Sequence, residues 1–567
     1  MQLQHDSGGG SSQNPAGLIG EDRLPGLFLR LRARLAERDR YDCAIAALLI
    51  VLVALAIATS GAYAISNDEE VQQHYGELIV AYYASGFTDQ ALFHYVNLYL
   101  YGGLFDIVAI FCERLLPFID AYSVRHVVCA LIGMSGIGAA GAAARLVMGP
   151  RAGAIAAFAL AACGPWYGSM FNHTKDIPFA AAMMGATYFL LRAGRDLPHP
   201  RRRHMIAFGL LLGCALGIRV LGLLMVGYAG LAIFMNMQRL RGEPLRDRVS
   251  FFAQSAIALT PAFLIAYAIM AAAWPWSALA PLNPMRGLVD FGEFHYHIRT
   301  VLDGRVYEMG EVPRWYVPAY LLIKLPLIML AGAGIALLFI LRPGKAAARW
   351  HRRRAETALL AFIAAFPVLC EVIERGPAFT GLRHFLFVVP TFAVLAGIGL
   401  DWLLMRGEAY GRVWARTAFA MIGAVLLWNA SILVALHPYE YLYYNPLVGG
   451  LEGASGAYVT DYWVDIMPEA VGDLEAYVAE LDRSGDRTHR YTVAVCGERL
   501  PFEKKANSRL QWTADWKKAD FFIAPTHMNC DRVLAGKVIT TITRLGARIG
   551  VVKDRRSLAQ SEVARHF

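Results

Sequence analysis

The chain has 567 residues, of which 56% are hydrophobic and 17% are charged, and its mean hydropathy is +0.40. A soluble protein carries roughly a quarter charged residues, so this composition excludes an ordinary soluble domain and indicates a membrane protein. The net charge of +9 does not require nucleic acid as a partner. Arg and Lys cluster in short loops between apolar runs, where they meet anionic lipid headgroups.

Residues 1–42 form a Gly/Ser-rich tail that ends in an Arg-rich stretch, Arg30 to Arg40. The first apolar run that follows has no small-residue cleavage site, so these residues do not resemble a cleaved signal peptide. We expect a disordered N-terminal tail in the cytoplasm.

Apolar runs of about 20 residues recur from Cys43 to Leu436 and predict a mainly α, polytopic helical membrane bundle. About eleven spans are expected, at 43–65, 122–145, 152–169, 177–193, 205–220, 221–237, 250–273, 315–341, 355–373, 384–404 and 416–436.

Segment 91–118 is also apolar, but it carries Asp106, Glu113 and Arg114. Its apolar residues recur at helical spacing, with Tyr95, Asp106 and Glu113 on the opposite side. Such a pattern favours a helix lying in the membrane interface over one that crosses the bilayer. If the segment does not cross, four basic loops fall on the same side as the Arg-rich tail, as the positive-inside rule requires. These loops are 145–151, 192–204, 238–248 and 342–354. We therefore predict a cytoplasmic N-terminus and an extracytoplasmic C-terminus.

The predicted domains follow from this topology. Residues 43–437 form the transmembrane domain, with extracytoplasmic loops at 66–122 and 274–314, and residues 438–567 form a small extracytoplasmic α/β domain. Cys496 and Cys530 lie in that last domain. They either form a disulfide, if the domain is outside, or are two unrelated thiols.

Acidic residues follow the first span directly, in the run Ser66-Asn67-Asp68-Glu69-Glu70. Carboxylates crowded at a membrane surface repel one another, which raises the pKa of at least one of them toward that of a useful base. The competing interpretation is a solvated helix start, with Asn67 as N-cap and the acids facing the helix dipole.

The shortest outside turn holds His173, Lys175 and Asp176 between two apolar runs. An acid, a lysine and a histidine in so short a turn form a candidate site. Alternatively, Asp176 is only a helix cap, since Pro178 suits the first turn of a helix.

Further cations and aromatic residues are expected on the same face. Arg219 lies at an outside turn within an apolar stretch, where an ionisable residue is paired or functional unless it snorkels to the headgroups. Arg383 and His384 stand at the outside start of the tenth span, and the planar fork of Arg suits phosphate. Tyr316 belongs to an aromatic-rich outer region that either covers a sugar or forms an interfacial belt.

In order along the chain, several of these stretches resemble motifs of the GT-C superfamily of membrane glycosyltransferases. The most similar members are the bacterial family 39 enzymes of the protein mannosyltransferase and aminoarabinose transferase type. The resemblance runs from about Ile65 to Trp463. It is carried by Asp68-Glu69, Lys175-Asp176-Ile177-Pro178, Pro313 to Pro318 with Lys324-Leu325-Pro326, Arg383-His384 to Pro390, and His437 to Gly450.

The resemblance implies an inverting glycosyltransferase of the bacterial inner membrane. It would take a sugar from a polyprenyl-phosphate lipid and pass it to a cell-envelope acceptor, a lipid, glycan or protein, on the extracytoplasmic face. Asp68, Glu69 and Asp176 would be catalytic residues, with Asp68 as the base, whereas His173, Lys175, Arg219, Tyr316, Arg383 and His384 would bind substrate. Some relatives bind a divalent metal ion near these carboxylates, so the resemblance leaves a metal undecided.

Two other functions compete with this one. A transporter or flippase would also carry charges at membrane depth, but the acids here sit in loops at one face. A polysaccharide polymerase or ligase with a diphosphate-linked donor is the other alternative. Neither the sugar, the acceptor nor the oligomeric state is readable from the sequence.

Overall fold

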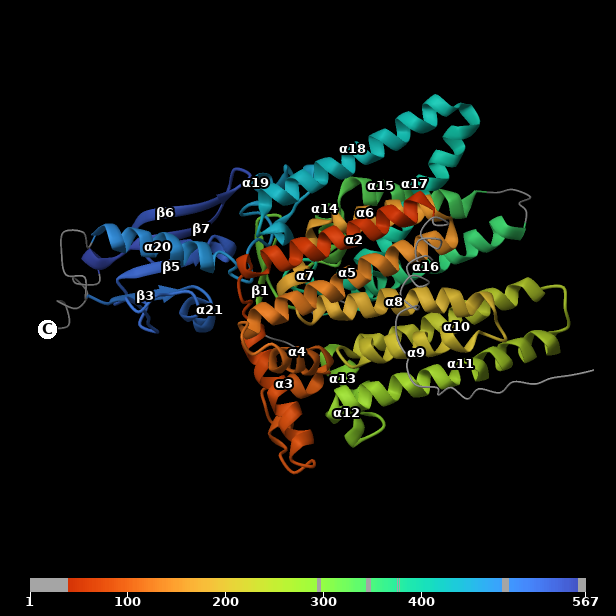
Figure 1. The fold of residues 1–567 in the computed structure, drawn as a ribbon, viewed down its shortest axis with the longest axis horizontal. Coiled ribbons are helices and arrows are strands. Elements are labelled where there is room, and N and C mark those ends of the chain that lie inside the picture. Colours follow the sequence, from red (N-terminus) through yellow and green to blue (C-terminus); the bar gives the residue numbers. More distant parts are fainter. Residues whose placement is uncertain are drawn as a thin grey trace, which may run out of the picture.

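The computed structural model describes residues 39–292, 297–342, 348–374, 376, 378–481 and 489–558. Most of the predicted tail, residues 1–38, lies outside them. Long helices run side by side along the molecule, and a sheet with its own helices lies at one end of the bundle (Figure 1). The predicted helical membrane bundle with a small C-terminal α/β domain is confirmed.

The bundle helices follow the apolar runs of the sequence. They are α2 (Arg40–Thr59), α5 (Ala121–Val147), α6 (Pro150–Ala161), α7 (Gly164–Asn172), α8 (Asp176–Arg195), α9 (Arg202–Leu216), α10 (Leu224–Met237), α11 (Leu245–Ala273), α14 (Tyr316–Lys324), α15 (Leu327–Leu341), α16 (Ala348–Glu374), α17 (Val389–Tyr410) and α18 (Arg412–Leu436). Short 3-10 turns η1 (Ser60–Ala62), η4 (Val220–Leu223), η5 (Gln238–Leu240) and η6 (Arg383–Val388) extend α2, α10 and α17.

By length and composition, eight helices of the described residues are able to cross a membrane. Two bent pairs raise the number to ten: α6 with α7, bent by 63°, and α14 with α15, bent by 114°. The remaining predicted span, 205–220, corresponds to α9, whose 15 residues fall short of that length. Since α9 packs against α8 and α11, all eleven predicted segments belong to the bundle.

Small residues let several bundle helices approach closely. A Cβ atom on Gly399 in α17 would lie 2.0 Å from the carbonyl oxygen of Gly332 in α15. Backbone contact of this kind is typical of membrane helices, whose association depends on van der Waals packing and not on the hydrophobic effect.

Segment 91–118 contains no helix long enough to cross. Its helix α4 (Leu104–Leu115) has 12 residues, which is about 18 Å against a hydrocarbon core of about 30 Å. It follows α3 (Glu69–Ala84) and the turns η2 (Ala91–Phe93) and η3 (Leu98–Leu100). These elements lie at the same end of the bundle as α12 (Pro275–Leu279) and α13 (Asn283–Gly292) (Figure 1). The helix in this segment is shorter than a span, and that the segment does not cross the bilayer stays a prediction.

The basic loops gather at the end of the bundle that lies away from the C-terminal sheet. Arg145 binds Asp42 at 2.6 Å, Arg195 binds Glu356 at 2.6 Å, and Arg353 contacts the sulfur of Met148 at 3.6 Å. Arg239 lines the same small cleft as Glu356. The four loops that charge counting grouped together therefore share one end of the structure.

The C-terminal domain holds a five-stranded sheet of order β4-β3-β5-β7-β6. Strand β3 (Tyr491–Val495) runs parallel to β4 (Leu510–Trp512) and β5 (Phe521–Pro525), and β7 (Ala547–Asp554) runs antiparallel to β5 and β6 (Lys537–Arg544). Helices α20 (Met467–Leu481) and α21 (Arg499–Glu503) and the turn η10 (His527–Arg532) complete it. A separate hairpin, β1 (Arg299–Leu302) and β2 (Arg305–Glu308), lies in the loop 274–314.

Residues 437–466, which we call the connecting segment, join α18 to this domain. They contain η7 (Glu440–Leu442), η8 (Pro446–Val448) and α19 (Gly450–Ala454). Tyr439, Tyr441 and Tyr443 of the segment are buried, and a Cβ atom on Gly168 of α7 would lie 2.1 Å from the amide nitrogen of Tyr441. The segment is therefore part of the bundle's outer end as much as of the C-terminal domain.

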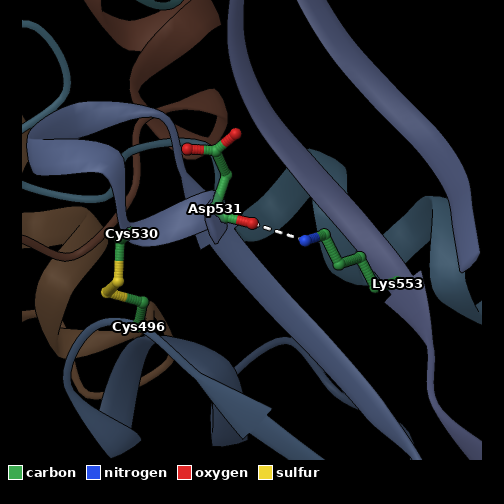
Figure 2. Close-up of a disulfide and its surroundings, with 4 residues drawn as sticks. All are labelled: Cys496, Cys530, Asp531 and Lys553. Atoms are coloured by element: carbon green, nitrogen blue, oxygen red, sulfur yellow. Dashed lines mark hydrogen bonds between the residues drawn. A yellow bond between two sulfur atoms is a disulfide. The ribbon is translucent and has the colours of Figure 1, made fainter. Parts of the chain in front are cut away.

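Cys496 and Cys530 are joined by a disulfide, as Figure 2 shows. The bond links the end of β3 to η10, and the next residue, Asp531, accepts a hydrogen bond from Lys553 of β7 through its carbonyl oxygen. Of the two readings of these cysteines, the structure supports the disulfide.

Replacing Cys496 and Cys530 together by Ser should destabilise the C-terminal domain. The disulfide spans 34 residues, and closing such a loop is worth about 4 kcal/mol in the chain-entropy model. Hydrogen exchange of the backbone amides of the five-stranded sheet, followed during denaturant titration, measures the change in this domain. The control is Cys43→Ser, which alters an exposed free thiol; equal midpoints for the two variants would contradict the prediction.

Candidate active site

Charged side chains from four distant stretches of the chain meet at the outer end of the bundle. The guanidinium of Arg383 ion-pairs with Asp68, and its Nε donates to Oδ2 of Asp176 at 3.0 Å. Arg219 ion-pairs with the other oxygen of Asp176. Four of the predicted site residues thus form one alternating chain of acids and cations, which we call the ion-pair chain: Asp68, Arg383, Asp176 and Arg219.

Local structure places each member of the ion-pair chain. Asp68 is the residue before α3, Asp176 is the first residue of α8, and Arg383 is the first residue of η6. Arg219 precedes η4, where the chain turns between α9 and α10. Each lies where a helix begins or turns at the same end of the bundle, so the fold brings them together.

The two carboxylates differ in exposure. The side chain of Asp68 is 38% exposed, whereas that of Asp176 is 4% exposed. Burial alone would raise the pKa of Asp68, but the charges of Arg383 and Lys175 outweigh it and hold this pKa below its ordinary value. Asp68 is therefore an ionised carboxylate that a substrate can reach, and Asp176 is a buried anchor for two arginines.

Lys175 lies beside the ion-pair chain. Its Nζ is 4.3 Å from the ring centroid of Tyr101, and the guanidinium of Arg219 is 5.8 Å from the same ring. Burial lowers the pKa of Lys175 to about 8, although Asp68 and Asp106 oppose the shift. Three cations accordingly surround two carboxylates, which leaves one positive charge in excess for an anionic ligand.

His173 is held as a neutral imidazole. The indole Nε1–H of Trp463 donates to its Nε2 at 2.9 Å, so the ring proton is on Nδ1, which faces Oδ1 of Asn172 at 3.0 Å. Burial lowers the pKa of His173 to about 3. The structure therefore places this residue as a support for Trp463 and does not present it as a cation.

The connecting segment contributes residues that our sequence reasoning missed. The ring of Trp463 lies 4.2 Å from the guanidinium carbon of Arg383, and Tyr462 hydroxyl is 2.7 Å from Nε2 of His173. Nδ2 of Asn172 donates to both oxygens of Asp465 at 3.0 Å. Two acids and two aromatic residues within 461–465, at the end of the connecting segment, were the available signal.

Among the described residues, three predicted site residues make no ion pair or hydrogen bond with the ion-pair chain: Glu69, Tyr316 and His384. Glu69 is fully buried, accepts from the backbone N–H of Ser66 at 2.7 Å and pairs with His126 at 3.1 Å. The hydroxyl of Tyr316 meets the hydroxyl of Thr300 at 2.6 Å and accepts from the backbone N–H of Gly381 at 2.8 Å.

The third, His384, packs beside Phe379, and the centroids of the two rings are 4.5 Å apart. With Glu69 and Tyr316 it shapes the loops that hold Asp68 and Arg383, and none of the three joins the ion-pair chain. For a metal ion, the described residues contain no group of three or more His, Cys, Asp or Glu placed to hold one.

Part of the chain matches the model of a known protein family. Residues 118–274 match the family model described as dolichyl-phosphate-mannose-protein mannosyltransferase. The matched segment includes His173, Lys175, Asp176 and Arg219, so it covers one half of the ion-pair chain. The resemblance to membrane glycosyltransferases is thereby confirmed. No curated protein matches the chain in sequence.

Solved structures give weaker likenesses. ArnT from Cupriavidus metallidurans bound to undecaprenyl phosphate is 16% identical, with a TM-score of 0.48 over 90% of this chain and 97% of that one. The oligosaccharyltransferase AglB from Archaeoglobus fulgidus, with an inhibitory peptide and a dolichol-phosphate, is 14% identical, with a TM-score of 0.43 over 84% and 69%. Arabinofuranosyltransferase AftD from Mycobacteria is 14% identical, with a TM-score of 0.37 over 89% and 41%.

Asp176→Asn should destabilise the protein strongly. The change leaves Arg219 without its carboxylate and removes one of the two partners of Arg383, and breaking a buried ion pair costs about 3–5 kcal/mol. Thermal unfolding of the purified protein in detergent measures the loss.

A matched control for Asp176→Asn is Asp42→Asn. It removes the partner of Arg145 at the opposite end of the bundle, where the two side chains are 21% and 45% exposed. Such a pair contributes at most about 1 kcal/mol. Equal melting temperatures for the two variants would contradict the importance given to Asp176.

Proposed function

We propose that this chain, a membrane glycosyltransferase of the GT-C superfamily, transfers a sugar from a polyprenyl-phosphate lipid to a hydroxyl group of a cell-envelope acceptor. The observation that carries the proposal is the ion-pair chain, in which a reachable carboxylate, Asp68, stands beside three cations. The matched family model supports the donor class, since it is named for a sugar carried on dolichyl phosphate.

In this reaction Asp68 is the general base. Its carboxylate takes the proton of the acceptor hydroxyl while that oxygen forms a bond to the anomeric carbon of the sugar. The bond from the anomeric carbon to the phosphate oxygen breaks on the opposite face, and its electron pair stays on the phosphate, so the anomeric centre is inverted. A phosphate leaves without a proton, and the site therefore needs cations and no general acid.

Lys175, Arg219 and Arg383 are the proposed cations. Arg presents a planar donor fork that matches phosphate oxygens, and Lys175 adds a point charge. Asp176 holds both arginines at the start of α8, so it acts as a positioning residue. Glu69, His173, Tyr316 and His384 are likewise proposed to position the loops and not to touch the reacting atoms.

The reaction is proposed to occur on the extracytoplasmic side of the bacterial inner membrane. The basic loops lie at the opposite end of the bundle from the site, and positive loops face the cytoplasm. On this assignment the C-terminal domain and its disulfide are outside, where disulfides persist. We propose the domain division 43–437 and 438–567, with the acceptor approaching Asp68 from the outer surface.

Asp68→Asn should abolish transfer and leave the fold intact. A general base contributes about 10²- to 10⁴-fold to the rate, and the side chain is 38% exposed and has a single ion-pair partner. Turnover is measured by the purified protein with radiolabelled polyprenyl-phosphate sugars and membrane extract as acceptor. Glu70→Gln, two positions further along, removes an exposed acid of the same run and should keep wild-type turnover.

The use of the donor should fall above about pH 8. The lowered pKa of Lys175, about 8, means that this side chain is charged below that pH and loses its charge as the pH rises through it. The ratio kcat/KM for the donor should therefore show an alkaline limb near pH 8. Lys175→Arg keeps the charge and should move the limb to higher pH; an unchanged limb would exclude Lys175 as its origin.

A further inference from the structure

Lys324 is a buried lysine that has no carboxylate partner among the described residues. It is 6% exposed and ends α14, where the chain bends by 114° into α15. Its Nζ donates to the carbonyl oxygen of Tyr441 at 3.0 Å and lies 3.8 Å from the ring centroid of Tyr444. Among the residues that the structure describes, no carboxylate lies within ion-pair distance of it.

Burying an unpaired ammonium group is costly, and at membrane depth such a residue is usually functional. A carbonyl oxygen and an aromatic ring satisfy part of its hydrogen-bonding and electrostatic need, but neither carries a negative charge. The arrangement is therefore suited to an anion that arrives with the substrate.

A pocket opens directly at this lysine. Its polar lining includes Lys324, Arg383, Ser169, Thr380, Tyr441 and Tyr462, and none of its lining residues is Asp or Glu. The hydroxyl of Tyr441 is already used, because it donates to Asp461. Two cations, hydroxyl groups and no carboxylate are the surroundings that a phosphate group requires.

Arg383 belongs both to this pocket and to the ion-pair chain. Its guanidinium contacts Asp68 and Asp176, and its side chain also lines the pocket with Lys324. An anion in the pocket would therefore meet Arg383 and Lys324 while the two carboxylates remain outside the pocket lining. The base and the anion site are thus separate but share one arginine.

We propose that this pocket binds a phosphate group and that Lys324 binds the leaving phosphate of the lipid donor directly. The inference rests on the proposed function and adds a fourth cation to it. As the bond between the anomeric carbon and the phosphate oxygen breaks, negative charge grows on that oxygen, and Lys324 stabilises the charge by a hydrogen bond. The negative charge of the bound phosphate favours the ammonium form of the lysine. No proton is transferred in the step.

Binding of a polyprenyl monophosphate to the full-length protein tests the proposal directly. Ligand-induced shifts in melting temperature are measured in detergent and converted to affinities for three probes: the polyprenyl monophosphate, the uncharged polyprenol of the same length, and inorganic phosphate. Lys324→Gln keeps a donor for the carbonyl of Tyr441 and removes the charge. We expect it to weaken binding of the lipid phosphate about tenfold or more, as for a lost charged hydrogen bond, and to leave polyprenol unaffected.

Two further variants complete the design. Ser169→Val narrows the pocket from the side of α7 without touching Lys324 and should weaken binding of the lipid phosphate as well. The matched control is Lys553→Met, because this lysine of the C-terminal domain also donates only to backbone carbonyls, at 2.9 Å from that of Leu534. It should bind all three probes as the wild type does.

Unchanged affinity of Lys324→Gln for the lipid phosphate would overturn the proposal. An equal loss of affinity for the lipid phosphate and for polyprenol would overturn it as well. Equal affinity of the wild type for inorganic phosphate and for the lipid phosphate would overturn the lipid as the source of the group. If the wild type transfers sugar and Lys324→Gln binds the lipid phosphate normally, this inference alone is wrong and the proposed function stands. If the protein binds the lipid phosphate tightly but transfers no sugar, the proposed function is wrong, whereas the proposed phosphate site in the pocket stands.

Discussion

The outer end of this protein depends on one buried guanidinium. Arg383 joins Asp68, which follows the first span, to Asp176, which begins α8, and through Asp176 it is linked to Arg219. A charge at membrane depth is expensive unless it is paired, so Asp176 and the two arginines stabilise one another. The loops that carry them can adopt few other arrangements, because any one of them that moved away would leave the others uncompensated.

The same constraint explains why the connecting segment is packed into the bundle. Trp463 covers Arg383 with its ring and fixes His173 with its indole N–H. Farther along, a Cβ atom on Gly497 would lie 3.1 Å from Val464, and the backbone N–H of Thr460 donates to His527 at 3.4 Å. The disulfide Cys496–Cys530 joins the two loops that make these contacts. The C-terminal domain therefore packs against the same segment whose Trp463 contacts Arg383.

The sequence predicts those features of the structure that the membrane environment requires. Lipid requires long apolar helices, so the spans were readable, and the positive-inside rule grouped the basic loops correctly. The same grouping placed Asp68, Lys175, Asp176, Arg219 and Arg383 on one face, which is why their convergence was predictable without any contact information. The sequence did not show in which direction each side chain points within that face. Successive residues of a helix point about 100° apart, so Asp68 faces Arg383 whereas Glu69 turns into the protein toward His126.

Residues whose partners lie far along the chain were also hidden. Lys324 sits in an apolar span as though it were a snorkelling lysine, and only the fold shows that Tyr441 and Tyr444 enclose it. Trp463 and Asp465 looked like the start of a soluble domain, since nothing local links them to His173 or Asn172. A single sequence carries no signal for such contacts beyond an unusual density of acids and aromatic rings.

The shared arginine also suggests why the base and the phosphate site lie so close together. While Arg383 is bound to Asp68, it holds the pKa of that carboxylate below its ordinary value and makes it a weak base. The phosphodiester of the donor carries one negative charge, as the carboxylate does, and in the adjoining pocket it competes for the same guanidinium. Each contact that Arg383 transfers to the phosphate raises the proton affinity of Asp68. Binding of the lipid phosphate would in this way strengthen the base.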